Sequence, residues 1–402
     1  MITAVKSLYP DLPHPELDKN DSDYTFSLKK HFYEILCNTK FPSNLDEEWR
    51  KIRLGTFNMG DYLETEKSLR IQTHNIEDRF VQPILNESDF TKKILDELTT
   101  EKKIPKKNQF FSLLALTYSQ LSLIIEIPSN YESNLPLIIE SSFKDYSRSA
   151  FFNVFIKVGK NTRVSLEDRC IMPVSESNNL LSSNFYVLLE ENANIDFIQN
   201  ENFFMNCFHF REYSFFQKRD SSTKIHSYNS GGLKGKTFFN IYLEESGSNS
   251  SIFGANSCIK REFQDIEFSI SHLNSNTNSS IKFKTVVKEK SHHIFTGNLF
   301  IPQSSRKVEA NQINHNLFLE KTARSESMPR LEVFSEDVKC SHGATMSEVE
   351  DDQLFYLLSR GISYTTAVKL IVEGFLSEVI DEIRSEEIKQ ELKTRLLQRL
   401  KL

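Results

Sequence analysis

The sequence predicts a mainly β protein with a parallel β-helix core, an N-terminal helical region and a C-terminal three-helix domain. Two changes of residue pattern support this prediction. From about residue 121 to 319, short runs of Val, Ile, Phe and Tyr are separated by Ser, Asn and Gly, which is typical of strands and turns. Beyond residue 347, apolar residues recur at helical spacing.

With 402 residues, the chain is long enough for two or three domains and a large core. We expect a mostly helical N-terminal region at 1–105, the β-helix at 106–335, and a C-terminal signature with its helices at 336–402. The net charge of -6, without a Lys/Arg-rich run, argues against a nucleic-acid partner. Five scattered cysteines and a charged first segment predict a cytoplasmic protein without export.

The N-terminal quarter contains two segments with helical spacing. The second begins at 95–98 and precedes a polar break at 102–107, and the first contains Phe26, Leu28, His31, Phe32, Ile35 and Leu36. The uncharged stretch at 108–125 resembles a membrane span, but its six polar residues would find no partners in hydrocarbon. It predicts a short buried helix at 110–116, followed by a strand from Leu121.

The β-rich region contains a weak internal repeat. After each polar turn, one β-branched residue opens a new strand, and these residues recur every 27 to 31 positions: Val164, Ile195, Ile225, Ile252, Ile281 and Val308. A unit of this size cannot bury its own apolar face, so the period predicts stacked coils that share one core. An antiparallel β-sandwich remains the alternative, because hairpins also space strands regularly.

Three helices are predicted after residue 347. Ser347 and Glu350 have the spacing of a capping box, which would open a helix that runs through Arg360 and ends at Gly361. A second helix is expected at 364–383, and a third begins after Ser385 as its cap.

Common catalytic motifs are absent from the sequence. The chain has no phosphate-binding loop before a helix, no nucleophile-elbow serine and no H-E-x-x-H zinc motif, so we expect no enzyme activity from the chain itself. His292 and His293 are adjacent and would point to opposite faces of a strand, which argues against a shared metal ion.

The sharpest candidate for a metal site lies at 338–345. On an extended segment, Cys340 and His342 share one face, and a thiolate sulfur and an imidazole nitrogen both bind iron or zinc. Two donors form only half a site, which a partner chain would complete. On spacing alone, a buried hydrophobic Cys340 beside a turn residue at His342 remains the competing interpretation.

This segment also resembles a known family. Residues 331–333 and 336–345, which include C-S-H-G-A-T, resemble the C-terminal signature of the SufB/SufD family of the SUF iron–sulfur cluster assembly system. The resemblance continues through 354–357, 359–362, 367, 374–375 and 378–380. The C-S-H-G-A-T form is similar to the SufD branch. Near the start, the segment from Phe41 through Trp49 and Arg50 to Leu54 resembles the family's Trp-Arg segment.

The resemblance implies a right-handed parallel β-helix between an N-terminal helical region and a C-terminal helical domain. It implies a non-catalytic scaffold that pairs with SufB through the β-helices and docks the SufC ATPase through the C-terminal helices. His342 and Cys340 would be metal ligands of a transient iron–sulfur cluster at the SufB interface, with no cofactor stably bound by the chain alone. When isolated, the chain could form a homodimer.

The helix faces and the resemblance together predict the SufC-binding residues: Leu354, Phe355, Tyr356, Arg360 and Phe375. Two other interpretations remain open. The chain could be SufB-like and bind a cluster alone. It could instead be a carbohydrate-active β-helix enzyme, for which only the acidic strand residues Asp196, Glu244 and Glu267 would be candidates, and we expect these three to face solvent.

Overall fold

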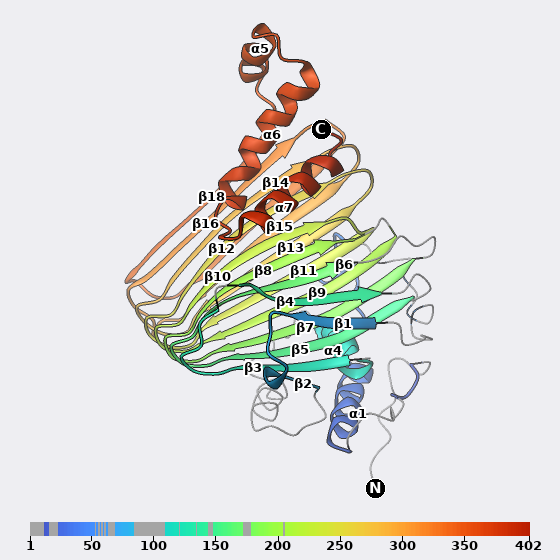
Figure 1. The fold of residues 1–402 in the computed structure, drawn as a ribbon, viewed down its shortest axis with the longest axis vertical. Helices are drawn as coiled ribbons and strands as arrows, with labels where there is room; N and C mark the ends of the chain where they lie inside the picture. The colour runs from blue at the N-terminus through green and yellow to red at the C-terminus, as the bar shows by residue number, and fades with distance from the viewer. Residues whose placement is uncertain are drawn as a thin grey trace.

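The computed structural model describes residues 12–15, 23–52, 54, 57, 59, 62, 69–83, 109–119, 121–133, 135–143, 148–171, 178–203 and 206–402. Within these residues, two nine-stranded sheets form the body of the molecule (Figure 1). Sheet A contains, in spatial order, β1 (Leu69–His74), β4 (Leu137–Phe143), β6 (Arg163–Ile171), β8 (Asn194–Asn202), β10 (Ser222–Ser230), β12 (Asn249–Cys258), β14 (Asn278–Val287), β16 (Val308–Phe318) and β18 (Val338–Glu348). Sheet B contains β17 (Arg324–Val333), β15 (His292–Ile301), β13 (Phe263–His272), β11 (Lys234–Leu243), β9 (Cys207–Gln217), β7 (Asn179–Leu189), β5 (Ser149–Val158), β3 (Leu121–Ile127) and β2 (Val81–Pro83).

Successive strands alternate between the two sheets. From β3 onward, each strand pairs in parallel with the strand two places further along the chain, as β5 does with β7 and β6 does with β8. Antiparallel pairing occurs only where β1 meets β4 and β2 meets β3, among the described strands. The fold is therefore a parallel β-solenoid, as predicted, and the antiparallel sandwich is wrong.

The predicted repeat is correct for some coils and shifted for others. Val164 pairs with Ile195, and Ile225, Ile252 and Ile281 pair in one row. Ile195, however, lies opposite Thr223 rather than Ile225. Because this shift is an even number of residues, the same side chains still face the interior, and all six predicted strand openers are buried.

Turns at one edge of the solenoid place asparagines in the left-handed region. Asn130, Asn161 and Asn192 have φ values of 61°, 55° and 56°, a conformation that asparagine tolerates better than most residues. Their amides also stack: Asn161 Nδ2 donates to Asn130 Oδ1 at 3.2 Å, and Asn192 Nδ2 donates to Asn161 Oδ1 at 2.9 Å. Asn161 and Asn192 belong to the polar turns that precede the predicted strand openers Val164 and Ile195.

The N-terminal region covers the outer face of sheet B. Helices α1 (Asp23–Asn38) and α4 (Gln109–Thr117) pack there, and they confirm the helical spacing near Phe32 and the predicted helix at 110–116. Trp49 contributes its ring, which lies 5.4 Å from that of Phe111 and 6.0 Å from that of Phe238. The one-turn helix η1 (Asp78–Phe80) precedes β2. The helical segment predicted at 95–98 and the polar break at 102–107 lie outside the described residues.

Three helices follow the last strand: α5 (Asp351–Ser359), α6 (Tyr364–Ile380) and α7 (Glu386–Arg399). Helices α6 and α7 lie against the outer face of sheet A, whereas α5 projects beyond the last coil (Figure 1). The predicted cap at Ser385 is confirmed, since its side chain accepts from the Ile388 amide at 3.4 Å. The predicted capping box is wrong: pairing with β16 keeps the chain extended through Glu348, and helix α5 begins at Asp351 without a side-chain cap. Residues 338–348 thus form a strand of the solenoid.

Candidate functional site

The last coil of the solenoid leaves both sheets open at the same end. In sheet A, β18 pairs with β16 over eleven residues and has no second partner among the described strands. In sheet B, β17 likewise forms the edge, paired with β15. An unpaired strand edge presents backbone N–H and C=O groups that another strand can bind.

Cys340 and His342 both lie on this open edge strand. Cys340 stands opposite Ala310, and His342 stands opposite Gln312. Cys340 is partly buried and contacts the apolar interior of the solenoid, while His342 is exposed. Because side chains two residues apart share a face, the two donors lie side by side on the inner side of the last coil.

The predicted shared face is therefore supported, and the competing interpretation is not. Cys340 is incompletely buried, and His342 lies within a strand rather than a turn. Burial raises the pKa of the Cys340 thiol above its usual range. The thiol is consequently protonated at neutral pH until a metal ion or a base removes the proton.

Cys340 is also the accessible thiol of this chain. The other four cysteines, Cys37, Cys170, Cys207 and Cys258, are buried, and none of the five forms a disulfide bond. Burial raises the pKa of Cys170 to about 12, so that thiol is unreactive. Sulfur chemistry with an external partner is thus directed to the open edge.

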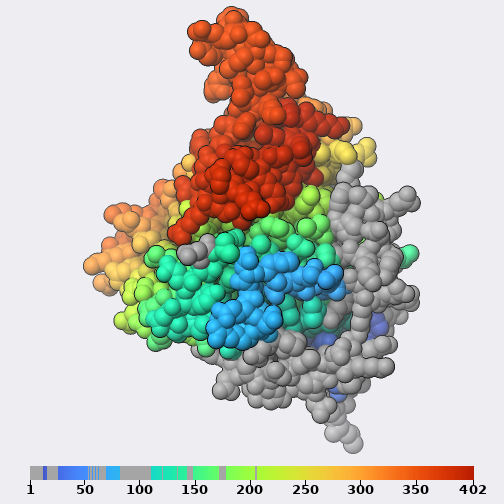
Figure 2. Space-filling view, viewed as in Figure 1, coloured from blue at the N-terminus to red at the C-terminus, as the bar shows by residue number. Residues whose placement is uncertain are grey.

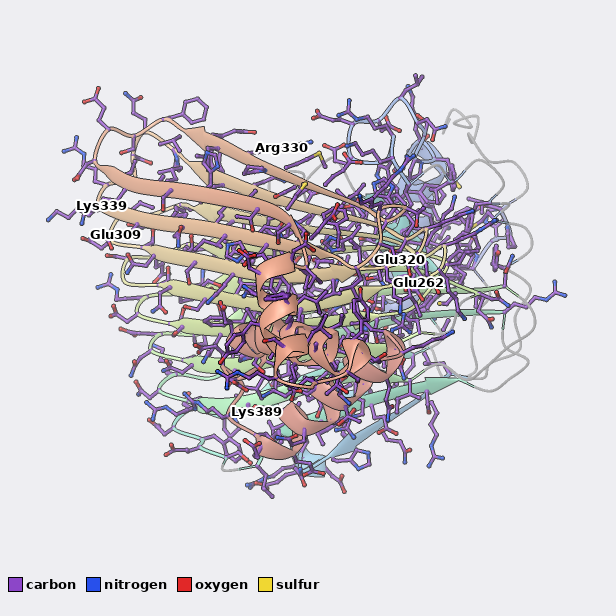
Figure 3. All side chains as sticks on the ribbon, turned by 90° about the horizontal axis from the view of Figure 1, so that it is seen from above. Glu262, Glu309, Glu320, Arg330, Lys339 and Lys389 are labelled. Carbon is purple, nitrogen blue, oxygen red and sulfur yellow. The ribbon has the colours of Figure 1, made fainter. Side chains whose placement is uncertain are left out.

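The outward face of the same strand is polar. Lys339 Nζ lies 2.6 Å from Glu309 Oε1, and Figure 3 shows the two side chains next to each other at the turn side of the last coils. Ser341 Oγ donates to Asn311 Oδ1 at 2.9 Å. A shallow groove of about 520 Å³ runs over this face, lined mainly by serines and asparagines. The two potential metal donors point away from it.

Two other features are absent from the described part of the chain. There, no group of three or more His, Cys, Asp and Glu side chains converges as a metal site would require. No helix among those residues is both long and apolar enough to cross a membrane.

The five residues predicted to bind the ATPase divide into two groups. Phe355 and Tyr356 are 72% and 58% exposed, and exposed Arg360 holds its guanidinium 5.3 Å from the Tyr356 ring. Leu354 and Phe375 are partly buried against the chain's own apolar cluster under α6 and α7. Helix α5 has no buried residue, and it stands clear of the body in Figure 2.

Of the acidic residues considered for carbohydrate chemistry, Asp196 and Glu267 are buried, so the expectation that they face solvent is wrong for these two, while Glu244 is partly exposed. Asp196 lies 3.0 Å from His226, Glu244 lies 2.6 Å from Lys218, and Glu267 lies 3.5 Å from Lys236. Asp196 is on sheet A and Glu267 is on sheet B, and both are buried. Asp196 lies near Arg384 on the outer face of sheet A, and Glu267 lies with Lys236 near Trp49 on the outer face of sheet B, so the two carboxylates cannot act as one acid/base pair.

The adjacent histidines behave as predicted. His293 is buried inside the solenoid, where it contacts Asn256 at 3.3 Å and Thr285 at 3.4 Å. His292 points the other way and lies 2.9 Å from Glu326. The two histidines therefore do not face a common metal ion.

The interior of the solenoid contains a charged cluster that was not predicted from the sequence. Arg211, which is fully buried, lies 2.9 Å from Asp168 and 2.5 Å from Glu201, and the Tyr213 hydroxyl oxygen lies 2.6 Å from Asp168 Oδ2 and 2.9 Å from Glu201 Oε1. Burial raises the pKa of Asp168 to about 6, although the Arg211 charge opposes that shift. Alternating charges on a strand are normally solvent-facing, so no sequence signal identified these residues as interior.

Comparison with known proteins places the edge strand and most of α6 inside a recognised domain. Residues 141–375 match the family model described as "SUF system FeS cluster assembly, SufBD core domain". The chain belongs to this SufB/SufD family. Both Cys340 and His342 fall within the matched region, as does the exposed part of α5.

Curated relatives support the same family. Over 192 residues, the chain is 32% identical to the iron–sulfur cluster assembly protein SufD of Escherichia coli K12. This match covers 48% of this chain and 45% of that protein. The chain is 26% identical over 295 residues to a SufBD family protein of Synechocystis, which covers 69% of this chain and 63% of the relative. A SufBD family protein of Staphylococcus epidermidis is 25% identical over 279 residues, which cover 69% and 60%. The chain thus matches 45% to 63% of the length of these relatives, which is less than two thirds in each case.

Proposed function

We propose that this SufB/SufD family chain is a non-catalytic, SufD-like scaffold that supplies half of an iron–sulfur cluster assembly site. The observation that carries the proposal is the pair Cys340 and His342, side by side on the inner face of an unpaired edge strand. Iron and sulfide are the substrates of this site, and the chain alone holds no stable cluster.

The open edge explains how a second chain would complete the site. A SufB solenoid that adds a strand beside β18 would satisfy its free backbone groups and cover the two donors. Binding of iron would then displace the proton from the Cys340 thiol, because metal coordination favours the thiolate. In the absence of SufB, a second copy of this chain could occupy the same edge as a homodimer.

The C-terminal helices supply the second contact of the proposed assembly. We place the SufC ATPase on the exposed side of α5, where Phe355, Tyr356 and Arg360 lie. Exposed aromatic residues beside an arginine are typical of binding hot spots. This chain has no phosphate-binding loop of its own. The ATPase therefore supplies the nucleotide-driven movement.

Co-purification with SufB and SufC, followed by iron and sulfide analysis under anaerobic conditions, tests the proposal. We expect Cys340→Ala and His342→Ala to retain both partners and to lose at least about tenfold of the cluster, since each removes one donor. Ser341→Ala lies between them on the opposite face and should leave the cluster content unchanged. Normal cluster content in both donor variants would remove the ligand roles, and a stable chromophore on the isolated chain would favour a SufB-like protein.

A further inference from the structure

The residue beneath His342 interrupts an apolar column inside the solenoid. Six successive strands of sheet A, from β4 to β14, place one apolar interior residue each in register: Leu137, Leu166, Phe197, Ile225, Ile252 and Ile281. The next residue of this column, on β16, is Gln312, and His342 on β18 follows it. An amide therefore replaces the apolar residue in the coil that lies next to the proposed half-site.

The facing column on sheet B changes at the same coil. Tyr213, Phe239 and Phe268 stack there in register, with successive ring centroids 4.7 Å and 4.8 Å apart. The next residue of that column, on β15, is Gly297. Its missing side chain makes room for Gln312, because a methyl group added at Gly297 would overlap Gln312 Oε1. The glutamine thus extends across the interior toward the position where the aromatic stack ends.

The side-chain carbonyl of Gln312 has no partner. The residue is 4% exposed, and its buried Oε1 atom accepts no hydrogen bond. A buried acceptor without a donor costs free energy, and an apolar side chain, as in the six strands before it, would avoid that cost. Packing alone therefore does not explain an amide at this position.

His342 is the next residue of the column, and its imidazole can supply the missing donor. Residues in register on adjacent parallel strands lie side by side on one face, so the His342 side chain begins directly above that of Gln312. A histidine that binds a metal ion through one ring nitrogen carries its proton on the other, and a carbonyl or carboxylate usually accepts that N–H. Cys340, by contrast, stands over Ala310, which has no polar side-chain group. The coil beneath the half-site thus places an acceptor under its imidazole only.

We propose that Gln312 is a positioning residue of the half-site, whose side-chain carbonyl accepts the imidazole N–H of His342 when the other ring nitrogen binds iron. This inference rests on the proposed function, because it requires a metal ion at His342. The hydrogen bond selects one tautomer of the imidazole and fixes the direction of a ring that is exposed in the chain alone. Gln312 itself does not touch the metal ion and acts through His342.

Binding of Co²⁺ to the anaerobic complex with SufB tests this role, since the visible absorption of the ion reports its coordination by thiolate and imidazole. Gln312→Met keeps the length of the side chain without the carbonyl and should weaken Co²⁺ binding about tenfold, the scale of a lost partner behind a metal-binding histidine. Gly297→Ala should weaken it as well, because the added methyl group displaces the Gln312 amide. The matched control, Asn311→Met, lies on the outward face of β16 and should leave the affinity unchanged.

A double-mutant cycle separates positioning from packing. In a His342→Ala background, Gln312→Met should cause no further loss of Co²⁺ binding, whereas in a Cys340→Ala background it should still weaken the binding. An equal loss in the His342→Ala background, or no loss in the original chain, would overturn the role of Gln312 alone. Binding of Co²⁺ that neither His342→Ala nor Cys340→Ala weakens would overturn the proposed half-site, and the role of Gln312 with it.

Discussion

Arg211 illustrates how this solenoid tolerates charge in its interior. The guanidinium lies between two buried carboxylates, and the aromatic ring of Phe185 lies 5.3 Å from its central carbon. Ser183 accepts a further hydrogen bond from Arg211 Nε at 2.7 Å. Each ion therefore has a close counter-ion, although Asp168 Oδ1 and Glu201 Oε2 make no hydrogen bond, and removal of Arg211 would leave both carboxylates buried without one.

We predict that Arg211→Met lowers the free energy of unfolding by about 3–5 kcal/mol, because Asp168 and Glu201 would lose their buried counter-ion. Urea unfolding followed by circular dichroism measures the change. The control is Lys160→Met, whose partner Glu191 is exposed, so its effect should stay below about 1 kcal/mol. Equal effects of the two substitutions would show that the interior cluster contributes little.

At the residue scale, prediction succeeded where local geometry decides the outcome. Strand alternation alone placed Cys340 and His342 on one face and separated His292 from His293. It could not show that Asp196 and Glu267 are buried. Their burial depends on the C-terminal helices that cover sheet A and on the N-terminal region around Trp49 that covers sheet B. Burial of a polar strand residue is a property of the layer packed over it.

At the element scale, helices and strands were predicted where their periodicity is strong. Helix α4 and the three C-terminal helices follow from the spacing of their apolar residues. The capping box at Ser347 failed because the backbone pairing of β18 with β16 continues through Glu348, and a sheet ladder outweighs one local cap. Glu350 instead accepts a hydrogen bond from Gln353 Nε2 at 2.7 Å.

Helix α5 gives a prediction about docking. Phe355→Asp should reduce capture of SufC at least about tenfold, because a charge on the exposed apolar face opposes burial against a partner. The melting temperature should not change, since α5 buries no residue in the chain itself. Pull-down with purified SufC measures the capture.

A matched control is available in the N-terminal region. Leu45 is 95% exposed in the N-terminal region, so Leu45→Asp changes surface charge equally without touching α5. Its SufC capture should be normal. If the two variants capture SufC equally well, the ATPase docks elsewhere on the chain.

At the scale of the whole molecule, the two ends of the solenoid differ in strand direction. Antiparallel strands β1 and β2 end the sheets at the N-terminal side, whereas parallel strands β17 and β18 end them at the C-terminal side, and β18 carries Cys340 and His342. The repeat of β-branched residues predicted the stack of coils, but it could not fix the register of Ile195 because coil lengths differ. Cys340 and His342 form the proposed half-site, and a partner that binds at the C-terminal end of the solenoid would complete it.

The alkylation rate of Cys340, followed on its own peptide by mass spectrometry, tests the central claim most directly. In the isolated chain, Cys340 should react much faster than the four buried cysteines. Addition of SufB should slow its reaction at least about tenfold, because the partner strand would cover the edge that carries it. An unchanged rate within an intact complex would contradict the account, since Cys340 and His342 would then lie away from the interface that is to complete their site.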